Sequence, residues 1–169
     1  MSSTSIGPRR AGKPRSPKSC HDRALGLLAV RPRARRELER RLLAAGFEAP
    51  EVDEVLVRLE RVGLIDDEAF AKQVADHQFG TRRAGRRAVT SGLLAKGIDP
   101  DLAARVAEQG DDDEEARVVG LARSRVSRLA GLEPAKAFAR LSSFLMRRGY
   151  GADVARSAAR TALEVDDQD

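Results

Sequence analysis

The chain has 169 residues and a net charge of +5 at neutral pH, which suits one ordinary domain or a short run of small modules. Its residues are 41% apolar but only 4% aromatic, so the core must consist mainly of Leu, Val and Ala, and these favour helices over sheets. A single cysteine excludes an intramolecular disulfide, and the absence of a long apolar run excludes a membrane span or secretory signal. We therefore expect a monomeric, all-α protein of the cytoplasm.

The two ends of the chain have the composition of unfolded segments. Residues 1–20 are rich in Ser, Gly, Pro, Arg and Lys and include Cys20, and they predict a disordered basic arm. We expect this arm to be a solvated terminus, with weak binding of phosphate groups as the alternative. Residues 164–169 form a short acidic tail.

The first predicted repeat covers residues 21–63 and contains three helices, over 22–29, 33–45 and 50–62. The first two are separated at Pro32, because the residue before a proline is pushed out of the α region. The third helix has a clear apolar face with helical spacing, formed by Val52, Val55, Leu56, Leu59 and Val62.

A short connector joins this repeat to the next. Gly63 is expected to end the helix, and the apolar Leu64 and Ile65 are expected to fill the space between repeats. Asp66 is suited to an N-cap, with Asp67 and Glu68 in the first turn of the following helix. We favour capping over metal binding or acid–base catalysis for these acids, because no histidine accompanies them.

The second predicted repeat covers residues 64–110, with helices over 67–79, 84–96 and 99–109. His77 shares a helical face with Phe70 and Val74, which predicts a half-buried histidine rather than a metal ligand. Gly92 falls inside the second helix, where glycine costs about 0.5–1 kcal/mol relative to alanine.

Four arginines lie in the stretch 81–87, which runs from the end of the first helix of this repeat into the start of the second. In a helix, Arg82 and Arg86 would form one repulsive i, i+4 pair, and Arg83 and Arg87 would form another. Such repulsion is tolerable on a solvated surface. The dense cluster of arginines is better explained, however, if an anion or an acidic partner compensates its charge.

The third predicted repeat covers residues 111–163. Its first helix follows a run of acids and ends near Gly131, its second begins at Pro134, and its third follows Gly151. An alignment of Ala24, Ala69 and Ala116 supports three modules of three helices each.

A six-residue block of two apolar residues, two variable residues, glycine and one apolar residue occurs once in each repeat. Its glycines are Gly46, Gly97 and Gly149, which lie 51 and 52 residues apart. Each block predicts a helix end at a glycine with positive φ, followed by an apolar residue that returns to the core. A period near 50 residues is typical of repeat proteins, so we expect an elongated, curved array of three tandem three-helix repeats.

Charge is segregated along the chain. Residues 31–41 carry +4 and residues 82–96 carry +5, whereas 48–68 carry −6 and 99–115 carry −7. Separated blocks of both signs predict a basic and an acidic face, which would steer the protein toward polyanions or a partner of matching charge.

Several of these stretches resemble the bacterial RecX regulatory proteins. They are the helix start at 33–38, the glycine blocks at 42–47, 94–98 and 144–150, and above all Gly63-Leu64-Ile65-Asp66-Asp67-Glu68-Ala69-Phe70-Ala71. The resemblance extends over about residues 22–163. It implies a non-enzymatic protein without cofactor or metal that binds RecA, lies in the groove of the RecA–DNA filament, and inhibits strand exchange, ATP hydrolysis and co-protease activity.

A basic surface is the expected contact with the filament, and with DNA phosphates only weakly. Its candidate residues are Arg33, Arg35, Arg36, Arg40, Arg41, Arg82, Arg83, Arg86, Arg87, Lys96, Arg147 and Arg148. Two alternatives are an enzyme, for which the sequence has no catalytic motif, and a stand-alone DNA-binding helical protein built on helix-turn-helix units.

Overall fold

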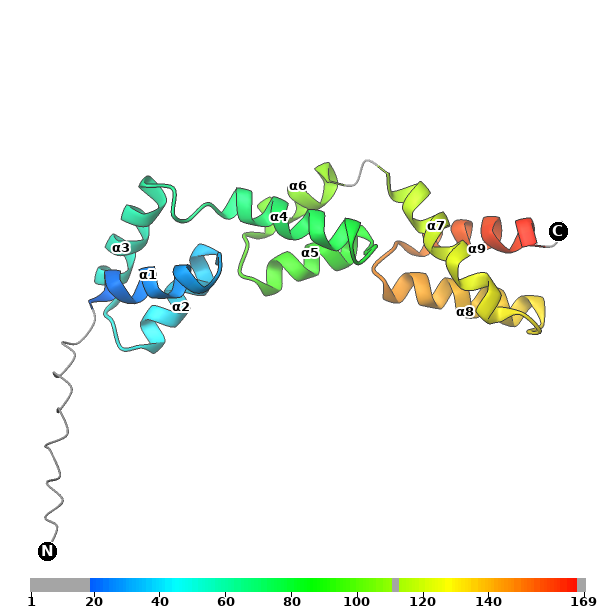
Figure 1. The fold of residues 1–169 in the computed structure, drawn as a ribbon, viewed down its shortest axis with the longest axis horizontal. Coiled ribbons are helices and arrows are strands. Elements are labelled where there is room, and N and C mark those ends of the chain that lie inside the picture. Colours follow the sequence, from blue (N-terminus) through cyan, green and yellow to red (C-terminus); the bar gives the residue numbers. More distant parts are fainter. Residues whose placement is uncertain (1–18, 111–112, 167–169) are drawn as a thin grey trace, which may run out of the picture.

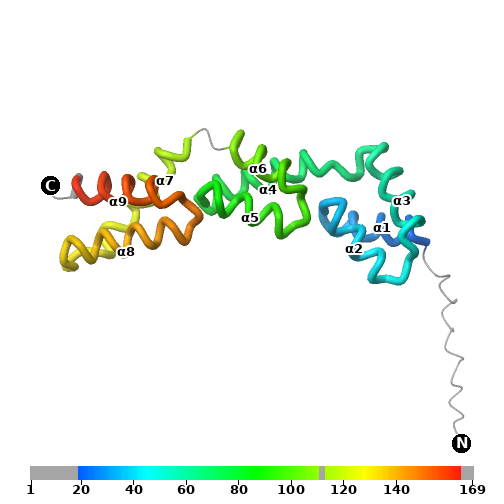
Figure 2. Tube along the Cα trace, turned by 180° about the vertical axis from the view of Figure 1, so that it is seen from behind, coloured from blue at the N-terminus to red at the C-terminus, as the bar shows by residue number. Residues whose placement is uncertain are grey.

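A computed structural model describes residues 19–110 and 113–166, so most of the predicted arm and the end of the acidic tail lie outside the described residues. The described chain consists of nine α-helices and one short 3₁₀ turn. The helices form three modules that follow one another in an elongated row (Figures 1 and 2). The predicted all-α fold with three tandem three-helix repeats is confirmed.

Each module contains three consecutive helices. Module 1 consists of α1 (Cys20–Val30), α2 (Arg35–Ala44) and α3 (Ala49–Arg61). Module 2 consists of α4 (Asp67–Gly80), α5 (Arg86–Ala95) and α6 (Pro100–Gln109). Module 3 consists of α7 (Glu114–Val126) with a 3₁₀ turn at Ser127–Leu129, α8 (Pro134–Arg147) and α9 (Ala152–Asp166).

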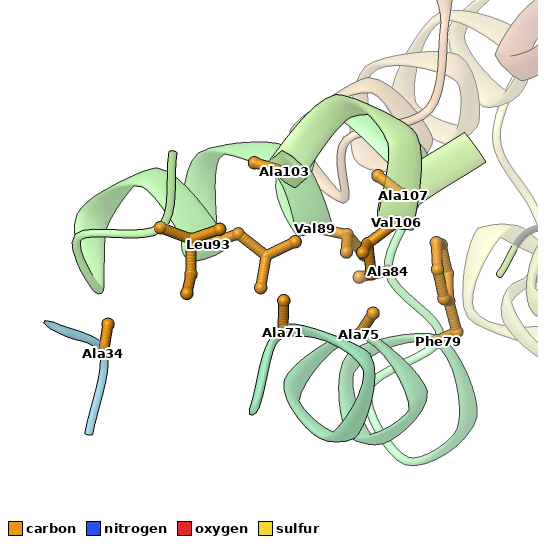
Figure 3. Close-up of a cluster of buried hydrophobic side chains, with 11 residues drawn as sticks. Ala34, Ala71, Ala75, Phe79, Ala84, Val89, Leu93, Ala103, Val106 and Ala107 are labelled. Carbon is orange, nitrogen blue, oxygen red and sulfur yellow. The ribbon is translucent and has the colours of Figure 1, made fainter. Parts of the chain in front are cut away.

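Every module has its own apolar core. In module 2 the core is made mostly of small side chains between α4, α5 and α6, as Figure 3 shows. In module 1 it includes Cys20, which is 1% exposed, so the assignment of this residue to the basic arm was wrong. Ser19 accounts for the difference, because its hydroxyl caps α1 by accepting from the amide of Asp22 and starts the helix at Cys20.

The first helices of the three modules can be aligned with one another, but the residues that correspond are not the predicted ones. Ala24, Ala71 and Val118 are each the fifth residue of their helix, and all three are buried. Ala69 and Ala116 are exposed, so their predicted alignment with Ala24 was wrong.

The glycine of each six-residue block ends a helix as predicted. Gly46, Gly97 and Gly149 have φ values of +92°, +87° and +92°. The residue after each glycine donates its amide back to the helix, as Tyr150 does to the carbonyl of Leu145 at 3.3 Å. Gly97 and Gly149 have a second role, because each lies against the second helix of the preceding module.

The contact between modules 2 and 3, here called seam 2–3, joins two helix ends. The amide of Gly85 donates to the carbonyl of Arg148 at 2.9 Å, and the amide of Arg87 donates to the carbonyl of Gly149 at 3.2 Å. A Cβ on Gly149 would collide with Ala88. The C-terminal end of α8 therefore satisfies amides at the N-terminus of α5 that the helix itself leaves without acceptors.

The contact between modules 1 and 2, here called seam 1–2, follows the same plan. Asp67 accepts a hydrogen bond from the amide of Arg35, at the start of α2, at 2.8 Å. A Cβ on Gly97 would lie 3.2 Å from Cβ of Arg36. Ala34, which precedes α2, is fully buried in the core of module 2 (Figure 3).

Predictions about two positions in the connector and helix of module 2 were wrong, and Gly92 has a role that was not predicted. Leu64 is 51% exposed and does not fill the space between modules, whereas Ile65 is buried in the core of module 1. His77 is exposed rather than half-buried. Gly92 has a packing role, because a Cβ there would collide with the side chain of Gln78.

A buried carboxylate holds the beginning of module 1 together. Glu37 accepts from Arg31 at 2.7 Å, from Arg41 at 2.9 Å and from Arg33 at short range. Arg33 also donates to the carbonyl of Leu27 at 3.1 Å. Burial by itself would raise the pKa of Glu37, but the three arginine hydrogen bonds outweigh it and lower that pKa.

The glycine contacts of seam 2–3 can be tested with two alanine substitutions. Gly46 and Gly149 share φ +92°, but a Cβ on Gly46 would meet no atom within 4 Å. Gly46→Ala should lower the free energy of unfolding by about 1–2 kcal/mol because of the backbone strain alone. Gly149→Ala should cost at least about 1 kcal/mol more, because α5 must also move. Urea unfolding measures both, and equal losses would contradict the close contact at seam 2–3.

The role of Glu37 can be tested by Glu37→Gln. Breaking a buried ion cluster should cost about 3 kcal/mol at pH 7. Because the pKa of Glu37 is lowered on folding, its stabilisation is present above the ordinary value of 4.5 and is lost as the pH falls through the lowered one. The variant should therefore lose less stability than the wild type during acidification, as measured by urea unfolding at pH 7 and pH 3. Glu54→Gln, at an exposed position of α3, is the control, and parallel pH curves for wild type and Glu37→Gln would refute this role.

Candidate partner-binding surface

The densest basic segment is a loop followed by a helix start. Thr81–Gly85 connects α4 to α5, and α5 begins only at Arg86, so the predicted helical i, i+4 pairs of arginines do not form. Arg83 has φ +46°, which is unusual for a residue other than glycine. The hydroxyl of Tyr150 donates to the carbonyl of Arg83 at 3.0 Å and holds this conformation from module 3.

The electrostatic setting of this segment favours an external anion. Arg82, Arg83, Arg86 and Arg87 are all exposed. The first turn of α5 holds two of them and no acidic residue, although the N-terminus of a helix is its positive end. The amides at this helix end already bond to module 3, so an anionic group at this place would be stabilised mainly by the arginine side chains.

The fold brings two further arginines to the same place. The hydrogen bonds of seam 2–3 set the end of α8, with Arg147 and Arg148, beside the start of α5. Arg147 is exposed, and Arg148 is half-buried. Nε of Arg148 is buried and has no hydrogen-bond partner within the described residues. Six arginines from two modules thus form one surface, here called the arginine surface: Arg82, Arg83, Arg86, Arg87, Arg147 and Arg148.

The predicted arginines of module 1 are divided between core and surface. Arg33 is 7% exposed and bound to Glu37, so its assignment to a basic surface was wrong. Arg35 is bound to Asp53 at 2.6 Å and to Glu60 at 3.0 Å, and it serves to hold α2 against α3. Arg36, Arg40 and Arg41 are exposed, although Arg41 also binds Glu37.

Lys96 lies apart from the arginine surface. It is the C-cap of α5 and lines a pocket at seam 1–2 together with Arg82 and Arg31. We did not predict Arg31 as a site residue. Its only sequence signal is its place before Pro32 at the end of a short helix.

Arg117 is a second residue that we did not predict. Its guanidinium lies 4.7 Å from the centre of the Phe79 ring, a cation–π contact that connects α7 to α4. Arg117 also lines a cavity of about 400 Å³ at seam 2–3 with Arg83. The arginine surface is therefore supported by a further contact between modules 2 and 3, in addition to the three hydrogen bonds across seam 2–3.

Within 19–110 and 113–166, no three His, Cys, Asp or Glu side chains lie close enough to hold a metal ion. Cys20 is buried, and burial, with a smaller effect of Glu51, raises the pKa of its thiol. In these same ranges, no helix combines the length and apolarity needed to cross a membrane.

Comparison with known proteins identifies the modules. Residues 20–59, 66–106 and 112–158 match the family models of the first, second and third three-helix domains of RecX. A regulatory protein RecX of Amycolatopsis mediterranei is 32% identical over 147 residues, which are 86% of this chain and 84% of that protein. Another from Mycobacterium sp. (strain JLS) is 34% identical over 159 residues, which are 91% of this chain and 87% of that protein.

A solved structure has the same fold. The crystal structure of RecX from Lactobacillus salivarius superposes with a TM-score of 0.79 at 21% identity, covering 85% of this chain and 94% of that one. The family models, the relatives and the order of the three modules lead to one assignment. The chain belongs to the RecX family of regulatory proteins.

Proposed function

We propose that this protein is a monomeric, non-enzymatic regulator that acts in the cytoplasm by binding RecA. It lies in the groove of the RecA–DNA filament and inhibits ATP hydrolysis, strand exchange and co-protease activity. The arginine surface carries this proposal, because its six arginines come from two modules and are held in place by the backbone contacts of seam 2–3. Such a surface fits a partner that presents acidic or phosphate groups over an extended length.

The elongated row of modules supports a repetitive partner. Each module has its own core, and the three modules follow one another in an elongated row (Figure 1). The basic residues of modules 1, 2 and 3 are therefore distributed over the length of this row. A molecule of this shape can contact several protomers of a filament simultaneously. Binding across protomers would oppose the relative movements that accompany ATP turnover.

The alternative of a stand-alone helix-turn-helix protein has less support. Such a protein places the N-terminal residues of a recognition helix in the major groove. The third helix of every module instead has an acid in its first turn: Glu51 in α3, Asp101 in α6 and Asp153 in α9. These carboxylates would repel DNA phosphates. The N-termini of α2 and α5 are occupied by the following modules.

The direct test is a titration of the DNA-dependent ATPase of RecA with the purified protein at two salt concentrations. We expect inhibition at stoichiometric ratios, weaker at high salt because exposed arginines contribute through screened charge. An unchanged RecA ATPase at low salt would refute the proposal.

The arginine surface can be tested by replacing Arg82, Arg83, Arg86 and Arg87 with Ala. We expect the concentration for half-maximal inhibition to rise by at least about tenfold, as for the loss of one or two charge-assisted hydrogen bonds. The control replaces the same number of exposed arginines in module 3: Arg123, Arg128, Arg140 and Arg160. Circular dichroism should show equal helicity in both variants. If both variants inhibited the RecA ATPase equally weakly, inhibition would depend on net charge and not on the arginine surface.

A further inference from the structure

A pocket at seam 1–2 is separate from the arginine surface except for Arg82. It has a volume of about 460 Å³ and lies between the end of α1 and the face of module 2 formed by α4 and the end of α5. Its charged and polar lining residues are Arg31, Arg82, Lys96, His77, Gln73 and Gln78. Among the residues that the structure describes, no aspartate or glutamate lines it.

Three cations from separate elements converge on this pocket. Arg31 is the C-cap of α1, Arg82 lies in the loop after α4, and Lys96 is the C-cap of α5. Within the described residues, neither Arg82 nor Lys96 forms an ion pair, so both charges are available. Arg31 binds Glu37, but two further arginines share that single carboxylate, so the cluster keeps a positive charge.

The remaining lining suits a phosphate group. His77, Gln73 and Gln78 can donate hydrogen bonds to phosphate oxygens. Phe70, Val74 and Pro32 also line the pocket, and apolar neighbours strengthen charge interactions by lowering the local dielectric constant. Gln78 lies against α5 because Gly92 leaves room for its side chain, so a glycine that weakens the helix helps to shape the pocket.

We propose that this pocket binds a phosphate group and thereby connects module 1 to module 2. Arg31 would contact the phosphate from module 1, and Arg82 and Lys96 from module 2. The phosphate can come from a nucleic acid backbone or from a free nucleotide, and both present the same group to the pocket. The inference extends the proposed function, because Arg82 also belongs to the arginine surface, but it does not require RecA.

The cations could instead have the sole role of stabilising the C-termini of the helices at whose ends they lie. Arg31 and Lys96 lie at the C-termini of α1 and α5, where positive charge is favourable in any case. That explanation requires no ligand. It predicts that their removal destabilises the fold and has no effect on phosphate affinity.

The test uses the full-length protein alone, titrated with inorganic phosphate at constant ionic strength and followed by two-dimensional amide NMR. We expect saturable shifts at Arg31, His77, Arg82 and Lys96. The double variant Arg82→Ala/Lys96→Ala should bind phosphate at least about tenfold more weakly, as for the loss of one charge-assisted contact. The double variant Arg123→Ala/Arg160→Ala removes the same charge from module 3 and should bind as the wild type does.

Two further ligands identify the source of the phosphate. Tighter binding of a short oligothymidylate at the same amides would assign the pocket to a nucleic acid backbone, and tighter binding of ADP would assign it to a nucleotide. Three results would overturn the inference. They are a phosphate titration without saturation, an equal loss of phosphate affinity in both double variants, and tighter binding of a glutamate-rich peptide than of phosphate. The RecA ATPase titration is independent of this result, so inhibition without phosphate binding refutes the pocket and leaves the proposed function standing.

Discussion

The fold of this protein depends on how the N-termini of two helices find hydrogen-bond acceptors. Neither α2 nor α5 has a side-chain cap, since their N-cap residues are Ala34 and Gly85. The following module supplies the acceptors: the carboxylate of Asp67 for α2, and the carbonyls of Arg148 and Gly149 for α5. A buried amide without an acceptor is costly, so each module has a defined place for the next one. A chain of three small modules, each with a modest core, thereby gains a fixed order and spacing.

The same contacts determine where the charge lies. Because α8 ends on the start of α5, Arg147 and Arg148 lie beside Arg82–Arg87, although more than 50 residues separate them in sequence. The Tyr150 hydroxyl then holds Arg83 in its positive-φ conformation from across seam 2–3. The glycine of the six-residue block was expected to end a helix, and Arg147 and Arg148 of the third copy were expected on the basic surface. The second and third copies of the block also build the seams, and the third copy contributes two arginines to the proposed binding surface.

Sequence reasoning was successful where the signal was local and periodic. The glycine spacing predicted the helix ends at 46, 97 and 149, and Asp66 caps α4 as expected by accepting from the amide of Ala69. It failed where a distant partner decides the outcome. Arg33 is buried because Glu37 binds it, and the helix predicted from residue 84 begins at Arg86 because module 3 holds Gly85 and Arg83. Gly92 is explained only by Gln78 of another helix. No local pattern carries these contacts.

Modules 2 and 3 each cap the second helix of the module before them, and native-state hydrogen exchange of backbone amides tests this arrangement most directly. The amides of Arg35, Gly85 and Arg87 lie at helix starts, where exchange is ordinarily fast. We predict protection close to that of the interior amides of Leu38 and Val89. The first-turn amide of Ala135 in α8, for which the described residues provide no acceptor from another module, should exchange rapidly in the same sample. If Arg35, Gly85 and Arg87 exchange as fast as Ala135, the seams do not form as described and the account of the array is wrong.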